Sequence, residues 1–282
     1  MKADMHIHST VSDGYYTIEE IIDMAIKRGL DAIAITDHDT LSHAKQIPKD
    51  CGILVMPGIE ISCYDYEKEF RVHILGYNIK TPEIVENFVH PTIEARHRNS
   101  LKQIEMLKQA GYEIDMNKMK KADGRYVYKQ HIMDYLCATG QVEEMFGSFY
   151  YKTFKNNGIC HFDITYVDPI KAVETIKEAG GTAVLAHSGQ QQNFELIPEL
   201  VQHGLDGLEL HHHANSKQDM EKIRDLAKQY QLLLTGGSDC HGLYEPNSPE
   251  VGDFLAEEES ADRIFGEYAY AVRQGREGVI PG

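Results

Sequence analysis

Two histidines near the N-terminus, His6 and His8, stand in an apolar run that is typical of a short β-strand. Successive side chains of a strand point to opposite faces, so both imidazoles should point to the same side. Neighbouring imidazoles bind divalent metal ions when carboxylates from other strands complete the site. The motif His6-Ile7-His8 therefore indicates metal chemistry, provided that other segments supply the remaining ligands.

Three further motifs place histidine and carboxylate residues directly after apolar runs. They are Thr36-Asp37-His38, Pro57-Gly58-Ile59-Glu60 and Gly237-Ser238-Asp239-Cys240-His241. A lone histidine at a strand end is more often a hydrogen-bonded structural residue than a metal ligand. Four motifs that each follow an apolar run are difficult to explain without a metal centre. Within the second motif, Asp37 is expected either to orient a ligand imidazole or to cap the next helix.

The candidate metal ligands come from these motifs and from neighbouring strand ends. The set is His6, His8, Asp13, His38, Glu60, His73, His187, Asp239 and His241. Nine side chains exceed the number that one tetrahedral or octahedral ion uses, so we expect two or three ions that share carboxylates. A mixture of imidazole and carboxylate ligands favours Mn²⁺, Fe²⁺ or Zn²⁺ and does not distinguish among them.

The elements that would position these ligands alternate between strand and helix. Strands are expected over residues 3–8, 31–36, 53–56 and 71–77. A capping box, Thr17-Ile18-Glu19-Glu20, predicts a helix between the first two strands. The alternation is interrupted and then resumes at Asp168-Pro169, where an N-cap precedes proline at the first helical position. Later strands are expected over residues 182–186, 206–210 and 232–235.

Strands that alternate with helices favour a parallel sheet wrapped by helices. The candidate ligands stand at the carboxyl ends of at least six strands, where (β/α) barrels carry their catalytic residues. A doubly wound open sheet also places ligands at strand ends, though usually at one crevice. Because a closed ring accommodates ligands from six strands better, we predict a barrel of the α/β class.

The segment from residue 82 to residue 165 departs from this alternation. It lacks strong strand patterns and contains a helical stretch from about Glu94 to Ala110, which Gly111 closes. Further helical patches follow around residues 128–139. We therefore predict an inserted, mostly helical substrate-specificity subdomain over residues 82–165. The barrel would then comprise residues 1–81 and 166–282.

The bulk properties restrict the classes of function. The chain has 282 residues and a net charge of −16 with neutral histidines, without the basic stripe that long nucleic acids require. No apolar run approaches the roughly 20 residues needed to cross a membrane, and the N-terminus does not resemble a signal peptide. The five cysteines form no CxxC pair, which fits reduced thiols. We expect a cytoplasmic protein without a membrane partner.

Taken in chain order, the motifs resemble those of the PHP (polymerase and histidinol phosphatase) family. The resemblance covers residues 6 to 241 and implies a distorted seven-stranded (β/α) barrel with a trinuclear metal site. Transferred to this chain, the family's ligands would place His6, His8, Glu60 and Asp239 around one ion. Glu60 would bridge to a second ion held by His73 and His187. Asp13, His38 and His241 would hold the third.

Clustered divalent ions are suited to hydrolysis, because they lower the pKa of bound water and clamp phosphoryl oxygens. We therefore expect a hydroxide held by the metal ions to attack phosphorus in line and cleave a phosphoester. Amidohydrolases also combine barrels with HxH motifs, but they usually add a metal-bridging lysine. The lysines of this chain stand mostly in helical or polar segments, which disfavours a carbonyl substrate.

The motif Ser12-Asp13-Gly14 and the long insertion resemble the stand-alone nucleotide phosphoesterase branch of the family. This resemblance implies hydrolysis of nucleoside 3′,5′-bisphosphates or nucleoside monophosphates, or of the 5′ ends of short RNA. The acidic chain favours small nucleotides over RNA. A histidinol phosphate phosphatase and a catalytically silent metal-binding protein remain alternative hypotheses. No obligate protein partner is expected.

Basic side chains of the insertion are candidates for contacts with the substrate phosphate. Arg96 and Arg98 open the long helix, and a planar guanidinium suits phosphate oxygens. Arg125 and His131 form a second basic group, and His212 follows a strand end. A solvated helix face explains any single arginine equally well.

Overall fold

The computed structural model describes residues 1–120, 126–244 and 248–273. The first three strands form a parallel sheet in the order β1-β2-β3, with Ala3 opposite Ala32 and Ile33 opposite Val55. Their bounds are Ala3–Ile7 for β1, Ala32–Ile35 for β2 and Leu54–Pro57 for β3. Helix α1, Ile18–Lys27, begins at the predicted capping box of Thr17 and Glu20. Its apolar face packs against this sheet in one buried cluster.

The remaining strands form a mixed sheet in the order β4-β5-β6-β7-β8. The bounds are Ile59–Asp65 for β4, Phe70–Tyr77 for β5, Thr182–Leu185 for β6, Gly207–His211 for β7 and Leu233–Gly236 for β8. Strand β5 runs antiparallel to both β4 and β6, whereas β6, β7 and β8 are parallel. The second sheet therefore starts with a hairpin and continues as βα units.

The prediction of a closed seven-stranded barrel is wrong, because the strands of the described residues form two separate sheets of three and five strands. Isolated bridges between Ile7 and Cys240 and between His38 and Glu60 join the sheets at the strand ends. The physical reason lies around Gly58, which alone separates β3 from β4. The chain turns there directly into an antiparallel hairpin, with no helix to carry it to a parallel neighbour. The sequence interpretation treated Glu60 as the end of a strand, whereas it lies near the start of β4.

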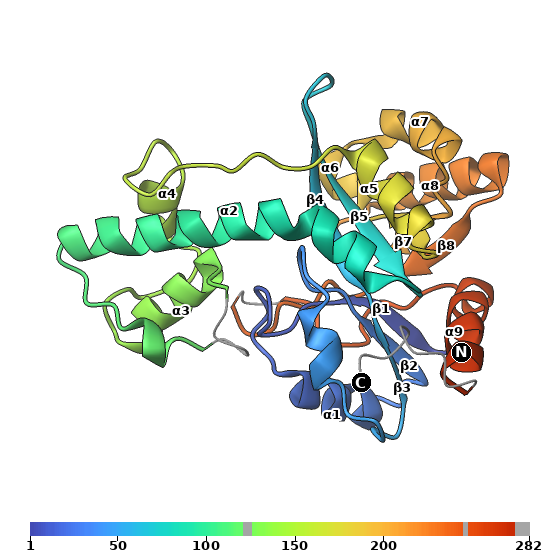
Figure 1. Cartoon of the computed structure of the whole chain (residues 1–282), viewed down its shortest axis with the longest axis horizontal. Coiled ribbons are helices and arrows are strands. Elements are labelled where there is room, and N and C mark those ends of the chain that lie inside the picture. Colours follow the sequence, from blue (N-terminus) through green and yellow to red (C-terminus); the bar gives the residue numbers. More distant parts are fainter. Residues whose placement is uncertain (121–125, 245–247, 274–282) are drawn as a thin grey trace.

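The segment after β5 is helical. It contains α2 (Pro82–Gln109), η2 (Met116–Lys118), α3 (Lys129–Ala138) and α4 (Ser148–Phe154). Helix α2 starts earlier than the sequence predicted and includes Pro91 in its interior. Its C-terminal half, with Ile104 and Leu107, packs with α3 and α4 in an apolar cluster of their own. Figure 1 shows α2 crossing the molecule, with α3 and α4 beside its far end. The division of the chain at residues 82 and 165 stays a prediction.

The C-terminal part completes the layers around the sheets. Its elements are α5 (Pro169–Glu178), α6 (Ser188–Gln191), η3 (Phe194–Leu196), α7 (Ile197–Gln202), α8 (Lys217–Tyr230) and α9 (Glu258–Arg273). Helices α5, α7 and α8 lie together around β7 and β8 in Figure 1, and they bury the apolar side of the mixed sheet. Helix α9 packs against β3 and β8. Within the described residues, no helix is long and apolar enough to cross a membrane.

Candidate metal centre

The His6 and His8 rings lie together at the end of β1, as strand alternation predicts. Both side chains are buried, and their Nε2 atoms are 3.3 Å apart. Met5 and Ile7 belong instead to apolar clusters of the core. The strand therefore turns two imidazoles toward the site and uses its other residues for packing.

The Glu60 carboxylate is the centre of the cluster. Its Oε2 lies 3.1 Å from His8 Nε2, 3.2 Å from His38 Nδ1 and 3.3 Å from His6 Nε2. Its Oε1 lies 2.7 Å from His73 Nδ1 and 3.0 Å from His187 Nε2. The two oxygens thus face different imidazoles, which is the arrangement of a carboxylate able to bridge two ions.

Asp239 approaches the same imidazoles from the end of β8. Its Oδ1 lies 3.1 Å from His8 Nε2 and 3.4 Å from His6 Nε2. The residue has a left-handed φ of 53°, and its backbone N–H donates to the His6 carbonyl at 2.8 Å. This strained conformation turns the carboxylate into the site, and the hydrogen bond to β1 holds it there.

Asp13, His38 and His241 form a neighbouring group. Asp13 Oδ1 lies 3.4 Å from His241 Nε2, and Asp13 Oδ2 lies 3.8 Å from His38 Nε2. The Gln130 amide at the start of α3 donates to Asp13 Oδ2 at 2.9 Å. The helical segment therefore reaches one of the candidate ligands directly.

The structure brings all nine predicted ligands into one cluster. Within the described residues there are four groups of side chains, and the ligand atoms of each group lie within 4.8 Å of one another. They are His6, His8, Glu60 and Asp239; His8, Asp13, His38 and His241; His38, Glu60 and His73; and His6, Glu209 and His212. The first group is the set expected for one ion. The second adds His8 to the expected trio, and the third has His38 where His187 was expected.

The charges of the cluster are strongly coupled. Burial opposes ionisation of Glu60, yet the imidazoles of His73 and His38 hold its pKa well below the usual value. Burial likewise disfavours a charged His8, but Asp239 and Glu60 raise its pKa to about 10. Burial lowers the pKa of His38 to about 4. Ionised carboxylates among buried imidazoles are the environment that a divalent cation requires.

Unsatisfied atoms also indicate that the residues fit metal ions. His8 Nδ1, His187 Nδ1 and Asp239 Oδ1 are buried and have no hydrogen-bond partner among the described residues. Buried polar atoms without partners are rare, because they lose water without replacement. Imidazole nitrogens and carboxylate oxygens are also the donor set of Mn²⁺, Fe²⁺ and Zn²⁺ sites. Metal binding by these nine residues stays a prediction that this geometry supports.

Glu209 is a residue that the sequence interpretation missed. It lies on β7, with Oε1 2.9 Å from His6 Nδ1, and its Oε2 accepts from the His187 backbone N–H at 2.8 Å. A signal was present, because Glu209 is a lone carboxylate between Leu208 and Leu210 in a buried strand.

The loop that carries Asp13 is held by Asp37. The Asp37 carboxylate accepts from the Ser9 backbone at 2.8 Å, the Ser9 hydroxyl at 2.7 Å and the Ser12 hydroxyl at 2.6 Å. It also lies 3.1 Å from His43 Nδ1. These contacts differ from both roles proposed for Asp37 from the sequence, since it neither orients a ligand imidazole nor caps a helix.

The predicted substrate-binding residues that the structure describes lie in different environments, and they do not form one site. Arg96 Nη2 donates to buried Asp39 at 2.7 Å and to Ser62 at 3.0 Å, and Arg98 is exposed. His131 is fully buried, and its Nδ1 accepts from the Tyr128 backbone. His212 Nε2 lies 3.2 Å from Asp239 Oδ2, inside the cluster. Arg125 lies outside the described residues.

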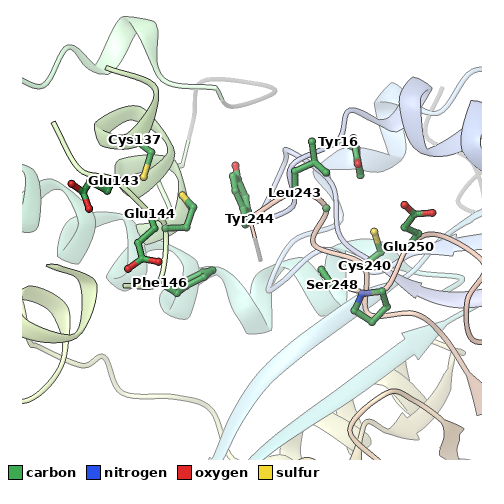
Figure 2. A pocket seen from close by; sticks show the side chains of 13 residues that line it. Tyr16, Cys137, Glu143, Glu144, Phe146, Cys240, Leu243, Tyr244, Ser248 and Glu250 are labelled. Carbon is green, nitrogen blue, oxygen red and sulfur yellow. The ribbon is translucent and has the colours of Figure 1, made fainter. Parts of the chain in front are cut away.

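Two cavities that share lining residues open beside the cluster. The smaller, about 280 Å³, is lined by Asp239 and His241 together with Gln130 and Tyr244. The larger, about 680 Å³, shares Tyr244 with it and extends between the residues after α3 and the segment that follows His241. Figure 2 shows Glu143 and Glu144 on one side of this cavity and Glu250 on the other, with Tyr244 between them.

The comparisons with known proteins agree with this site. The chain matches the PHP domain over residues 4–269 and therefore belongs to the PHP domain family. It is 41% identical to a phosphoribosyl 1,2-cyclic phosphate 1,2-diphosphodiesterase of Eggerthella lenta, over 89% of this chain and 98% of that protein. It is 29% identical to a 3′,5′-nucleoside bisphosphate phosphatase of Chromobacterium violaceum, over 84% and 86% of the two chains.

The fold has a close counterpart among solved structures. A proposed metal-dependent phosphoesterase of Bifidobacterium adolescentis is 28% identical and superposes with a TM-score of 0.82, over 94% of this chain and 96% of that one. Together these likenesses confirm the prediction of a metal-dependent phosphoesterase of the PHP family. Membership of this family implies a requirement for divalent metal ions.

Proposed function

We propose that the protein hydrolyses phosphate esters of small nucleotides, with nucleoside 3′,5′-bisphosphates or nucleoside monophosphates as substrates. The observation that carries this proposal is Glu60, whose two oxygens lie within 3.3 Å of nitrogens from five imidazoles. Such a cluster is suited to phosphoryl oxygens, on which negative charge shifts during hydrolysis. The cavity of about 280 Å³ beside Asp239 leaves room for a small ester next to the cluster.

Three divalent ions, chosen from Mn²⁺, Fe²⁺ and Zn²⁺, would be held by the nine predicted ligands. When bound, such ions polarise the phosphoryl group and make water acidic enough to react near neutral pH. Neighbouring side chains hold the metal ligands in position. Glu209 orients His6, and His212 lies against the outer oxygen of Asp239. Asp37 holds the loop that carries Asp13.

A cyclic ribose phosphate is a second candidate substrate. It is favoured by the 41% identity to a phosphoribosyl cyclic phosphate diphosphodiesterase, of which this chain covers nearly the whole length. Opening a cyclic diester and cleaving a monoester both add water at phosphorus, so the same cluster serves both reactions. Nucleoside 3′,5′-bisphosphates and the cyclic ribose phosphate share a ribose that carries more than one phosphoester bond.

Phosphorus NMR on the Mn²⁺-loaded protein tests both candidates. Adenosine 3′,5′-bisphosphate, AMP, phosphoribosyl 1,2-cyclic phosphate and histidinol phosphate are compared side by side. Ring opening moves the phosphorus signal without releasing phosphate, so diester and monoester cleavage are distinguished. A preference of about tenfold in kcat/KM, near 1.4 kcal/mol in the barrier, for a nucleotide would support the first candidate. Preference for histidinol phosphate, or no turnover at all, would refute the proposal.

A pair of histidine variants controls for contaminating phosphatases. His73→Ala removes an imidazole 2.7 Å from Glu60 and should lower kcat/KM at least about 100-fold, since a metal ion contributes several kcal/mol to phosphoryl transfer. His203→Ala removes a surface imidazole that pairs with Glu174 and should leave activity unchanged. Equal activities in both variants would exclude His73 from the centre.

A further inference from the structure

A small cavity of about 110 Å³ shares no lining residue with the acidic cavity of Figure 2. Helix α2, the start of α3 and the segment around residues 162–166 enclose it. Its lining includes Arg96, Gln103, Lys129 and Gln130. Because Gln130 also donates to Asp13, this cavity adjoins the candidate metal centre directly.

Two cations, Arg96 and Lys129, and one carboxylate, Asp163, line this cavity. Burial, together with the charges of Lys155 and Arg96, lowers the pKa of Lys129 to about 8, and Asp163 opposes this only in part. Among the residues that the structure describes, no carboxylate lies within 4.0 Å of the Lys129 ammonium, although Asp163 lines the same cavity. Its ammonium lies 5.8 Å from the Phe154 ring instead. Lys129 is therefore a largely buried cation whose charge Asp163 compensates only in part.

Arg96 lines the same cavity and has one hydrogen-bond donor without a partner among the described residues. Its Nη2 binds Asp39 and Ser62, but its buried Nε has no hydrogen-bond partner within the described ranges. A desolvated cation such as Lys129 is unfavourable unless an anion compensates for the lost water. A guanidinium and an ammonium that line one cavity are both suited to contact a phosphoryl group.

The size of the cavity restricts the anion. A water molecule occupies about 30 Å³ in the liquid, so the cavity holds about four waters. One tetrahedral phosphoryl group fits this space, whereas a nucleoside does not. The cavity of about 680 Å³ carries Glu143, Glu144 and Glu250 and would repel a second phosphate. Charge therefore favours the small cavity over the larger one as the place of a second phosphate.

We propose that the cavity between α2 and α3 binds a second phosphoryl group of the substrate, with Lys129 as the residue that selects bisphosphorylated over monophosphorylated ribose. This inference rests on the proposed function and specifies its substrate class. One phosphoester lies at the metal cluster, and the other phosphate lies against Lys129 and the free edge of Arg96. No bond to the second phosphate is made or broken.

Kinetics of the Mn²⁺-loaded protein and its Lys129→Met variant test this assignment. Adenosine 3′,5′-bisphosphate is compared with adenosine 3′-monophosphate and adenosine 5′-monophosphate, so that each monophosphate retains one of the two esters. Methionine keeps most of the lysine stem and removes the charge. The variant should lose about 10- to 100-fold in kcat/KM for the bisphosphate, as expected for a charge-assisted contact, and keep the wild-type rate with the monophosphates. Lys152→Met, on the exposed face of α4, is the matched control for net charge.

The outcomes distinguish a failure of the Lys129 assignment from a failure of the proposed function. A Lys129→Met enzyme that keeps the wild-type preference, a wild-type enzyme without preference, or an equal loss in Lys152→Met would overturn the assignment of Lys129. If the wild-type protein hydrolyses none of the three nucleotides, the proposed function fails. Calorimetric titration with adenosine 3′,5′-bisphosphate then decides on the subsite alone, because Lys129→Met should weaken binding about tenfold or more. Equal affinity of the two proteins would refute it.

Discussion

Glu209 Oε1 lies 2.9 Å from His6 Nδ1, although the two residues are 203 positions apart in the sequence. Both side chains are buried, and the second oxygen of Glu209 accepts from the His187 backbone. One carboxylate thus fixes the ring of a ligand on β1 and the backbone of a ligand after β6. With Nδ1 engaged, His6 presents Nε2 to Glu60 and Asp239.

Replacing Glu209 by glutamine should weaken metal binding. Glutamine keeps the size of the side chain but loses the charge that supports the imidazole, so metal affinity should fall about 10- to 100-fold. Metal content after dialysis against a graded chelator measures this affinity, with circular dichroism to verify folding. Glu257→Gln is the matched control, because Glu257 forms the same contact with His211 at 2.9 Å near the surface. Equal metal content in both variants would remove Glu209 from this role.

Arg96 has a structural role besides any contact with substrate. Its ion pair with Asp39 joins α2 to the residues after β2, and Asp39 is fully shielded from solvent. Arg96→Met should therefore destabilise the protein by about 3 kcal/mol, because it leaves a buried carboxylate unpaired. Urea denaturation measures the loss. The double variant with Asp39→Asn should recover part of it, and strictly additive effects of the two substitutions would show that the pair is not coupled.

Gly237 is required by the close approach of β1. A Cβ at this position would lie 2.3 Å from both Cβ and N of His6, so the backbone would have to move. Gly237→Ala should cost about 1–3 kcal/mol through overpacking and lower the metal content by displacing His6 from Asp239. Gly266→Ala is the control, since a Cβ at that position in α9 meets no atom within 4 Å. Alanine there should be neutral or stabilise the helix by up to about 1 kcal/mol. An unaltered metal content in Gly237→Ala would contradict the predicted coupling.

The candidate ligands were predictable because their positions follow from local rules. Strand alternation places His6 and His8 on one side, and the ligands of the other three motifs follow apolar runs. Asp13 lies instead in the loop after β1, and His73 lies inside β5. The barrel prediction failed at Gly58, because the choice between a hairpin and a crossover depends on which strand pairs with β4. That pairing is a long-range property, as is the contact of Glu209 with His6. Lys129 also has no local signal, since its burial arises from packing of α3 against α2 and the segment near residue 163.

Removal and addition of metal should change the stability of the fold. The cluster concentrates the carboxylates of Asp13, Glu60 and Asp239 among buried imidazoles, and a bound cation would satisfy groups that water cannot reach. A ligand that binds only the folded state stabilises it by about 2.7 kcal/mol at one hundred times its Kd. The melting temperature of the chelator-treated protein should therefore rise with Mn²⁺ concentration in differential scanning calorimetry.

Glu60→Gln should abolish most of this rise, because Glu60 belongs to two of the four ligand groups. Glu174→Gln, which alters a surface contact with His203, should keep it. A melting temperature that does not respond to Mn²⁺, Fe²⁺ or Zn²⁺ in the wild-type protein would refute metal binding at this cluster.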